Sequence, residues 1–374
     1  MKARHHTRAL RAAFLLVGLS ILLLALPVCA ATAPPTRRAA AGTRWTTTTP
    51  LKAVDFVSGS CGWAAGNGGL ILRTTTGGRT WTTQRRYRSA RGDIIDLSFV
   101  NRSRGWASGS SGLLLRTTNG GAAWRVQSPS VGGDNLTSVK AVSSSVVWTC
   151  GGFASAIFDD AHPPTGTVWR SGSGGAAWTH ADFTGFAPVA LDATGGLTCW
   201  AVGPLRHQTD PTTGYNTFGW TVTTDGGATW SPPAEIFNAP VVVGTPWGID
   251  VRGATIAVVG ADDGTGTAVA MVSADGGASW NAITWPLGSS SIFTDVKVVS
   301  STTVYAVGVS RIVWKTTDGG VTWGPHQLPA NVAIEDLDFV SGSTGYVVGR
   351  YGAGTETGRV YKTTSGATRW TRVR

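Results

Sequence analysis

One phrase recurs along the chain, and its spacing restricts the possible folds more than any other feature. It ends in tryptophan, as in TTDGGATW at Trp230, SADGGASW at Trp280 and TTDGGVTW at Trp323. Complete or degenerate copies end at Trp81, Trp124, Trp178, Trp230, Trp280, Trp323 and Trp370, and a half-copy, AGTRW, ends at Trp45. Successive tryptophans are 36 to 54 residues apart. A period in this range, with strand-like content, predicts a propeller with one blade for each repeat.

Each repeat contains four segments that have the pattern of strands. The first alternates apolar and polar residues, as in LKAVDF (51–56), IIDLSFV (94–100) and IEDLDFV (334–340), and this alternation indicates a strand with two unlike faces. The second follows the pattern GWAAG (62–66), the third the pattern LILRTT, and the fourth begins at the repeat tryptophan. Seven copies of each predict an all-β, seven-bladed β-propeller of four-stranded antiparallel blades over residues 45–374.

The turn between the third and fourth strands has a defined local chemistry. Asp225, Asp275 and Asp318 can fold their carboxylates back onto nearby backbone N–H groups, and the Gly-Gly that follows accepts positive φ. Asn119 can do the same. We therefore interpret these residues as structural rather than catalytic. Each repeat tryptophan is expected to pack between adjacent blades.

The first 31 residues have the composition of a targeting segment. Four basic and no acidic residues within 1–11 precede an apolar run at 12–28. This is the layout of a secretory signal, and the run is also long enough for an uncleaved membrane anchor. Cys29 gives a weak likeness to a lipoprotein box. All three interpretations place the body outside the cytoplasm, beyond a flexible Pro/Ala/Arg linker at 32–44, with membrane contact only through an uncleaved N-terminal segment.

The charge balance suits anionic surfaces and acidic partners. The net charge is +10, and without the basic targeting segment 27 basic and 21 acidic residues remain. Ordinary solubility charge explains the same excess equally well. No nucleic-acid-binding module is recognisable, so nucleic acid is not an expected partner.

Three cysteines remain in the body: Cys61, Cys150 and Cys199. In an oxidising compartment an odd number leaves at least one thiol free or paired with another chain. Cys150 and Cys199 lie on corresponding strands of neighbouring blades but differ in facing, so a disulfide between them is not favoured. Burial as small apolar side chains is expected instead.

Closure of the ring has two candidate strands. Trp45 begins a lone fourth-type strand before the first blade, and Trp370 begins the last blade's own. In many propellers an N-terminal strand completes the final blade. We expect residues 45–49 to pair beside the last blade.

The repeat resembles the Asp-box, also called the bacterial neuraminidase repeat. The fuller unit, LKAVDFVSGSCGWAAGNGGLILRTTTGGRTW at 51–81, is similar to the photosystem II assembly/stability factor family, a group of seven-bladed lumenal propellers. The resemblance extends over 45–374, with insertions in the middle blades. It implies a non-enzymatic helper, without a cofactor, that binds a membrane-protein subunit or complex. It also implies an arginine patch, although its positions cannot be matched to this sequence.

A cationic run offers one candidate partner site. QRRYRSAR (84–91) connects the first two blades on the ring face opposite the Asp-box turns. Its candidate contact residues are Arg85, Arg86, Tyr87, Arg88 and Arg91. Together they suit carboxylates or acidic loops, although a solvated loop has the same composition.

Two long connections on the same face offer a second candidate. They occupy 151–166 and 203–219, where most blades have short turns, and neighbouring insertions can form a shared wall. Their candidate residues are Asp159, Asp160, His162, Arg206, His207, Asp210 and Tyr215. The spacing matches no metal-ligand motif, so a recognition loop is favoured and no metal is expected.

Two alternatives to a binding protein stay open. Sialidases also use Asp-box propellers, but they need an arginine triad and a Tyr–Glu pair, and the three glutamates here, Glu235, Glu335 and Glu356, are scattered. Another glycoside hydrolase built on two aspartates is conceivable. A structural surface protein of a non-photosynthetic bacterium is the second alternative. The expected molecule is an exported, protein-binding, monomeric propeller.

Overall fold

The structure is a computed structural model. It describes residues 49–86, 92–127, 134–153, 163–206, 216–236, 243–262, 266–284, 292–352 and 357–374 of the 374-residue chain. All of them belong to one compact unit, Arg44–Arg374. No helix in these ranges has the length and apolar character needed to span a bilayer.

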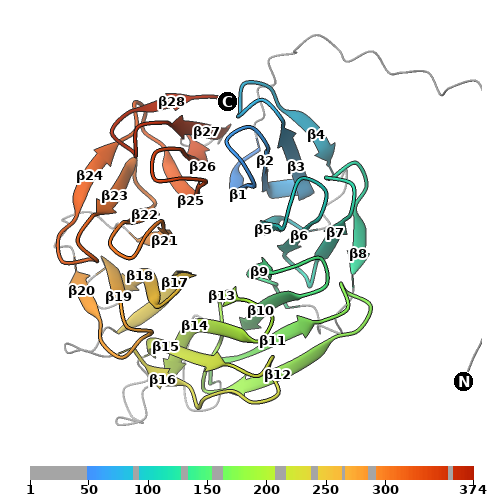
Figure 1. The fold of residues 1–374 in the computed structure, drawn as a ribbon, viewed down its shortest axis with the longest axis vertical. Coiled ribbons are helices and arrows are strands. Elements are labelled where there is room, and N and C mark those ends of the chain that lie inside the picture. Colours follow the sequence, from blue (N-terminus) through green and yellow to red (C-terminus); the bar gives the residue numbers. More distant parts are fainter. Residues whose placement is uncertain are drawn as a thin grey trace, which may run out of the picture. The chain divides into compact units, whose positions relative to one another are not determined.

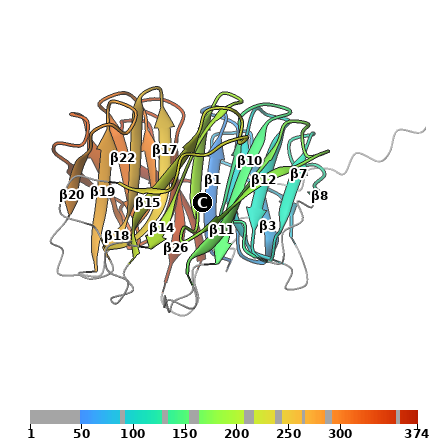
Figure 2. The same cartoon turned by 90° about the horizontal axis from the view of Figure 1, so that it is seen from below.

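The described strands form seven four-stranded antiparallel sheets arranged in a ring (Figure 1). Each sheet takes its strands from one continuous stretch of the chain, and its first strand lies nearest the centre. Figure 2 shows that the strands run between the two faces of this ring. The predicted all-β, seven-bladed propeller is therefore confirmed.

The first four sheets, blades 1 to 4, have the following strands. Blade 1 contains β1 (Leu51–Phe56), β2 (Gly62–Gly66), β3 (Leu70–Thr74) and β4 (Thr82–Arg85), with a 3-10 helix η1 (Asn67–Gly69) between β2 and β3. Blade 2 contains β5 (Ile94–Phe99), β6 (Gly105–Gly109), β7 (Leu114–Thr117) and β8 (Arg125–Gln127). Blade 3 contains β9 (Ser138–Ala141), β10 (Val147–Phe153), β11 (Thr165–Ser171) and β12 (Thr179–Thr184). Blade 4 contains β13 (Ala190–Thr194), β14 (Thr198–Arg206), β15 (Asn216–Thr223) and β16 (Ala234–Glu235).

The other three sheets, blades 5 to 7, complete the ring. Blade 5 contains β17 (Gly244–Arg252), β18 (Thr255–Asp262), β19 (Thr267–Ser273) and β20 (Asn281–Thr284). Blade 6 contains β21 (Phe293–Val298), β22 (Val304–Gly308), β23 (Ile312–Thr316) and β24 (Gly324–Gln327). Blade 7 contains β25 (Ala333–Phe339), β26 (Gly345–Tyr351), β27 (Thr357–Thr363) and β28 (Trp370–Arg372).

The fourth strand begins at or directly after the repeat tryptophan in six blades, as the repeat predicts. Blade 4 differs, because β16 begins four residues after Trp230 and is two residues long. Pro232 and Pro233 follow the tryptophan in this blade. Proline has no N–H to donate to a strand ladder, so regular pairing is delayed until Ala234.

The core of the molecule lies between the blades rather than inside them. Seven clusters of buried apolar residues each combine side chains from two neighbouring blades. Each cluster includes, or packs against, the repeat tryptophan of one of its two blades. Hydrophobic burial therefore holds neighbouring blades together around the whole ring.

In three blades the inner-strand phenylalanine fills the space left by a glycine. A Cβ on Gly62 would lie 2.3 Å from the Phe56 ring, and a Cβ on Gly105 would lie 2.2 Å from the Phe99 ring. Phe99 stacks on Trp63 of blade 1, with ring centroids 3.5 Å apart, and meets Trp124 edge-on. The pairing of D-F-V or S-F-V with G-W or G-Y in the sequence therefore has a steric cause. The third such pair is Phe339 and Gly345.

The Asp-box turns satisfy their own backbone donors. Asp318 Oδ1 accepts the Thr322 N–H at 2.9 Å and the Thr316 hydroxyl at 2.7 Å. These hydrogen bonds lower the pKa of the Asp318 carboxyl to about 2. Asp225 and Asp275 make the same contacts, and Asn119 Oδ1 accepts the Ala123 N–H at 2.8 Å. We call the ring face with these turns the turn face, and the opposite face the connection face.

A buried hydroxyl at the start of each turn is a testable part of this structure. Thr316 is 1 % exposed, and its Oγ1 accepts the N–H of Gly320 at 3.0 Å. Thr316→Val leaves that N–H unpaired in a buried place, so we expect a loss of about 2 kcal/mol in the free energy of unfolding, measured by urea denaturation. The neighbouring Thr317 is exposed, and Thr317→Val is expected to change stability by less than about 0.5 kcal/mol. Equal losses for the two variants would contradict this role.

The ring closes between blades 7 and 1. The fourth strand of blade 7 is β28, from the C-terminal end of the chain. Residues 45–48 of the expected closing strand lie outside the described residues, and the Thr49 carbonyl accepts the Gly358 N–H of β27 at 3.1 Å. Across this boundary Phe56 stacks on Tyr346, with ring centroids 3.4 Å apart. The same kind of aromatic contact therefore closes the ring and joins blades within it.

The cysteines of the propeller are buried and free. Cys150 and Cys199 lie in one cluster between blades 3 and 4. From the sequence, their different facing was expected to separate them. In the structure they lie in the same cluster, because two neighbouring blades contact each other through opposite faces of their sheets. Burial raises the pKa of both thiols, which keeps them in the unreactive thiol form.

Candidate functional site

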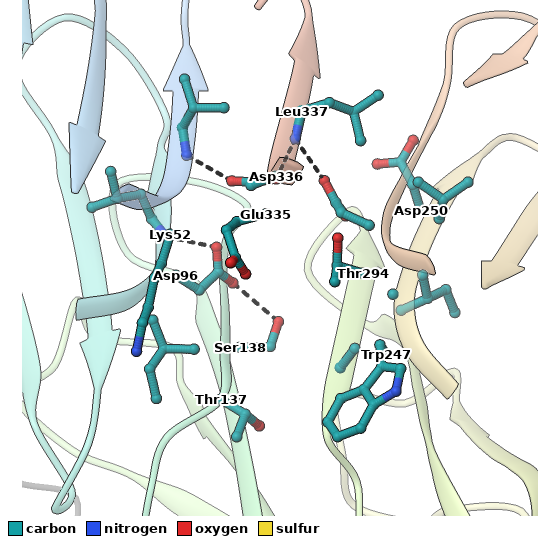
Figure 3. Close-up of a pocket in the computed structure, with 18 of the residues that line it drawn as sticks. Lys52, Asp96, Thr137, Ser138, Trp247, Asp250, Thr294, Glu335, Asp336 and Leu337 are labelled. Atoms are coloured by element: carbon teal, nitrogen blue, oxygen red, sulfur yellow. Dashed lines mark hydrogen bonds between the residues drawn. The ribbon is translucent and has the colours of Figure 1, made fainter. Parts of the chain in front are cut away.

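The inner strands β1, β5, β9, β13, β17, β21 and β25 lie around the centre of the ring (Figure 1). Side chains of all seven inner strands or their flanking residues line a cavity of about 510 Å³, which we call the channel (Figure 3). This site was not predicted from the sequence. Its signal was present in the polar positions of the alternating first strands.

Near its start, on the connection face, the inner strand contains a bulge. The glycine that ends each G-W-x-x-G-type segment lies against a backbone carbonyl at or just before the start of the inner strand. A Cβ on Gly66, Gly203 or Gly308 would lie 1.8 to 2.1 Å from that oxygen, which belongs to Pro50, Ala187 or Ile292. A shift in strand register marks the bulge in five blades. A bulge turns one extra side chain out of the ladder.

The bulge residues of five blades and the residues at the same repeat position in blades 3 and 4 lie around the channel mouth, and we call these seven residues the rim. The rim consists of Lys52, Ile95, Thr137, Val189, Trp247, Thr294 and Glu335. The next residue along each strand forms the upper tier: Ala53, Asp96, Ser138, Ala190, Gly248, Asp295 and Asp336. Two residues further lies the lower tier: Asp55, Ser98, Lys140, Asp192, Asp250, Lys297 and Asp338.

Side chains of the two tiers connect each blade to the next one along the chain. The inner edge of a propeller blade has no further strand, so its N–H groups need other acceptors. Asp336 Oδ2 accepts the Val54 N–H at 2.6 Å, and Asp338 Oδ2 accepts the Phe56 N–H at 2.8 Å, which joins blade 7 to blade 1. The equivalent carboxylate contacts are Asp55 with Phe99, Asp96 with Val139, Asp192 with Val251, Asp250 with Val298 and Asp295 with Leu337.

Serine hydroxyls make the same contact where aspartate is absent. Ser98 Oγ accepts the Ala141 N–H at 3.0 Å, and Ser138 Oγ accepts the Leu191 N–H at 3.4 Å. With these, every one of the seven boundaries between blades is crossed by at least one such hydrogen bond. The polar residues of the channel therefore hold the ring together.

Two lysines of the lower tier pair with some of these carboxylates. Lys140 Nζ lies 2.6 Å from Asp192. Lys297 Nζ lies 3.4 Å from both Asp250 and Asp338, which belong to the blades on either side. Asp250, and then Asp338, raise the pKa of the Lys297 ammonium well above its ordinary value. The tiers contain seven aspartates and two lysines, so their charge is predominantly negative where the acids are ionised.

Burial raises the pKa values of several channel carboxyls. The pKa is about 7 for Asp55 and about 6 for Asp96 and Asp250, because desolvation disfavours the charged form. Burial also raises the pKa of the Asp295 carboxyl, and burial followed by the charge of Asp295 raises the pKa of Asp336 well above its ordinary value.

The channel wall is therefore rich in carboxyl groups, and burial makes several of them weaker acids than an exposed aspartate. Within the described ranges, no three His, Cys, Asp or Glu side chains are grouped so that they could hold a metal ion. The oxygens of these carboxyl groups accept backbone N–H groups of the neighbouring blade, so the primary role of their arrangement is to stabilise the fold.

The candidate partner residues from the sequence are placed only in part. Arg85 ends β4 of blade 1, Arg86 follows it, and Arg206 ends β14 of blade 4. All three lie at the connection face, but blades 1 and 4 are not neighbours, so the structure does not bring Arg206 together with Arg85 and Arg86. The other candidates lie outside the described residues: Tyr87, Arg88, Arg91, Asp159, Asp160, His162, His207, Asp210 and Tyr215.

A ring of seven four-stranded sheets, with Asp-box turns between the third and fourth strands, defines an Asp-box β-propeller. The model of the family described as "Photosynthesis system II assembly factor YCF48" matches residues 43–181. Over this part of the chain, the resemblance inferred from the repeat is confirmed. No curated protein matches the sequence.

Solved structures with the same fold include members of that family and enzymes. "YCF48 bound to D1 peptide" is 19% identical with a TM-score of 0.57, over 81% of this chain and 91% of that chain. "YCF48 from Cyanidioschyzon merolae" is 18% identical with a TM-score of 0.59, over 85% and 96%. A streptogramin B lyase is 8% identical with a TM-score of 0.60, over 86% and 96%. At these identities the likeness shows the fold alone.

Proposed function

We propose that this chain is an exported, non-enzymatic propeller that binds an extramembrane segment of a membrane-protein subunit during assembly of a complex. The observation that carries the proposal is the match of residues 43–181 to a family described as an assembly factor. A solved structure of a similar propeller has a D1 peptide bound, which makes a peptide segment the first ligand to test.

The channel favours a binding role over a catalytic one. Glycoside hydrolysis needs two carboxyl groups free to transfer a proton and to attack or activate water. Each of the seven channel aspartates accepts a backbone N–H from the next blade. These carboxyl groups hold neighbouring blades in place. A rigid scaffold of this kind suits binding of a partner by the loops on its faces.

Peptide binding tests the proposal directly. The full chain, purified in a mild detergent, is titrated with labelled peptides that cover the extramembrane loops and termini of membrane proteins from the same genome, together with a D1 peptide. We expect saturable binding of one or a few segments, measured by fluorescence polarisation. Failure of every segment to bind, or turnover of a glycoside by the chain, would overturn the proposal.

Arg85 and Arg86 are proposed partner contacts on the connection face. Reversal of both to glutamate should weaken binding of the captured segment by about tenfold, because charges at the edge of an interface steer and hold an oppositely charged partner. Arg104→Glu with Arg125→Glu is the matched control, since both are exposed on the turn side of blade 2. Equal affinity of the two double variants would remove these arginines from the interface.

A further inference from the structure

The channel mouth has an apolar sector that none of the described side chains covers. The Trp247 side chain belongs to the rim and is 46% exposed. Figure 3 shows it across the cavity from Lys52 and Asp96. Val189, Ile292 and Val309 line the cavity on blades 4 and 6, on either side of Trp247 in blade 5. An indole left in contact with water at the mouth of a cavity favours an apolar or cationic ligand group.

The charged sector of the rim is already paired within the protein. Lys52 Nζ lies 3.1 Å from Asp93, and Arg350 Nε lies 2.9 Å from Glu335. These two ion pairs are on blades 7, 1 and 2, away from Trp247. The apolar sector is therefore the part of the rim that is best suited to contact another molecule.

The wall directly inside the rim has carboxyl groups and no cation. The upper tier contains Asp96, Asp295 and Asp336, whereas the two lysines of the tiers, Lys140 and Lys297, belong to the lower tier. Backbone N–H groups, not an ammonium or guanidinium group, are the main partners of these three carboxyls. A cation that enters past the rim meets them first and would relieve the cost of ionising buried acids.

We propose that the mouth of the central channel binds a basic, extended segment of the partner protein. An apolar side chain of that segment packs on Trp247, and a neighbouring lysine or arginine enters the channel toward the upper-tier carboxyls. The proposal rests on the proposed function and names the partner's chemistry: an apolar residue next to a basic one. A cavity of about 510 Å³ is within the range that accommodates such groups.

A positional-scanning heptapeptide library tests this inference. Pools with fixed lysine, arginine, glutamate or acetyl-lysine at the central position are passed over the immobilised full chain, and retention is measured. We expect the lysine and arginine pools to be retained at least about tenfold better than the glutamate and acetyl-lysine pools, with the preference reduced in high salt. Equal retention of all pools would overturn the proposal.

Trp247→Ala provides the second measurement. Because Trp247 is 46% exposed, the variant should keep its unfolding midpoint, yet it should lose about tenfold in affinity for the best basic pool. Tyr351→Ala is the matched control: Tyr351 is an aromatic residue, 40% exposed, at the end of β26 and outside the cavity lining. Unchanged binding by Trp247→Ala, or equal losses in the two variants, would also overturn the proposal.

The outcomes separate this inference from the proposed function. If a partner segment binds but Trp247→Ala and removal of its basic residue leave the affinity unchanged, the binding function stands and the channel mouth is not its site. If neither the partner segments nor the library pools bind, both proposals fail.

Discussion

Replacement of Lys297 by methionine is expected to lower the free energy of unfolding by about 3 kcal/mol at pH 7.5, because two buried carboxylates lose their cation. Asp250 and Asp338 are 9% and 7% exposed, and each lies 3.4 Å from Lys297 Nζ. The lysine joins blades 5, 6 and 7. Urea denaturation, followed by far-UV circular dichroism, measures the loss as a lower midpoint at an unchanged slope.

The control replaces another inner-strand lysine in the same way. Lys52 pairs with Asp93 at 3.1 Å, but both side chains are more than a third exposed. Surface ion pairs of this kind contribute about 1 kcal/mol or less, so Lys52→Met should have a small effect. Equal losses in the two variants would show that the buried ion pairs of Lys297 contribute no more than the exposed pair of Lys52.

Lower pH should restore part of the Lys297→Met loss. Without the ammonium group, the pKa of the Asp250 carboxyl rises further, so at pH 5 this carboxyl is protonated and needs no cation. We expect the deficit to shrink by at least half between pH 7.5 and pH 5. A deficit that is the same at both pH values would mean that the charge of Lys297 is not what stabilises the ring.

The sequence predicts the ring because the repeat tryptophan of each blade packs in the apolar cluster at a boundary between two blades. Trp124, for example, meets Phe99 edge-on at the boundary between blades 1 and 2, and the recurrence of this tryptophan gives the number of blades. Blade 4 departs at β16 for a local reason, the two prolines after Ser231. That delay could have been predicted from the missing N–H groups.

The channel could not be predicted from alternation alone. A period of two shows that LKAVDF and IEDLDF have two unlike faces, but not that the polar face points toward six other strands. Asp338 and Phe56, which form a hydrogen bond, are 282 residues apart, and only closure of the ring brings them together. The recurring aspartates of the first strands were a visible signal, but the turn motif, which carried the prediction, contains none of them.

The candidate partner residues show a different limit. Arg85, Arg86 and Arg206 lie at ends of strands, where the repeat fixes the face and the blade. Repeat position does not determine the conformation of a long insertion such as 203–219, because its residues have no counterpart in the other blades. The rim residue Trp247 was missed for a related reason. The alternating pattern of the strand does not distinguish this residue, and only the bulge between Pro246 and Gly248 in the folded chain places it at the channel mouth.

The last prediction concerns stability against pH, which should increase as the pH falls from 8 to 5. Asp55 has a pKa of about 7 in the folded protein, and Asp96 and Asp250 about 6, against 3.8 for the free side chain. Between these values the folded protein binds more protons than the unfolded chain, so lower pH favours folding, and the gain levels off near pH 4. A tenfold difference in proton affinity between the folded and unfolded states corresponds to about 1.4 kcal/mol. Because the carboxyls interact and face an open channel, we expect a net gain of about 2 kcal/mol.

Other groups act in the opposite direction but not strongly in this window. Asp225, Asp275 and Asp318 have pKa values of about 2, so their contribution is lost only below about pH 4. Burial lowers the pKa of His326, which favours folding at higher pH, and this single group is outnumbered by the channel acids. Thermal unfolding at half-unit intervals between pH 5 and pH 8 measures the balance as a change in Tm.

Asp55→Asn identifies the source of the pH dependence. The asparagine oxygen can still accept the Phe99 N–H that Asp55 accepts, but the side chain no longer titrates. The variant should be at least as stable as the natural chain at pH 8, and its slope between pH 8 and pH 6 should be visibly flatter. Asp225→Asn, in an exposed turn, should leave that slope unchanged. If stability falls from pH 8 to pH 5, or if both variants flatten the slope equally, the raised pKa values of the channel carboxyls do not control the stability of the ring.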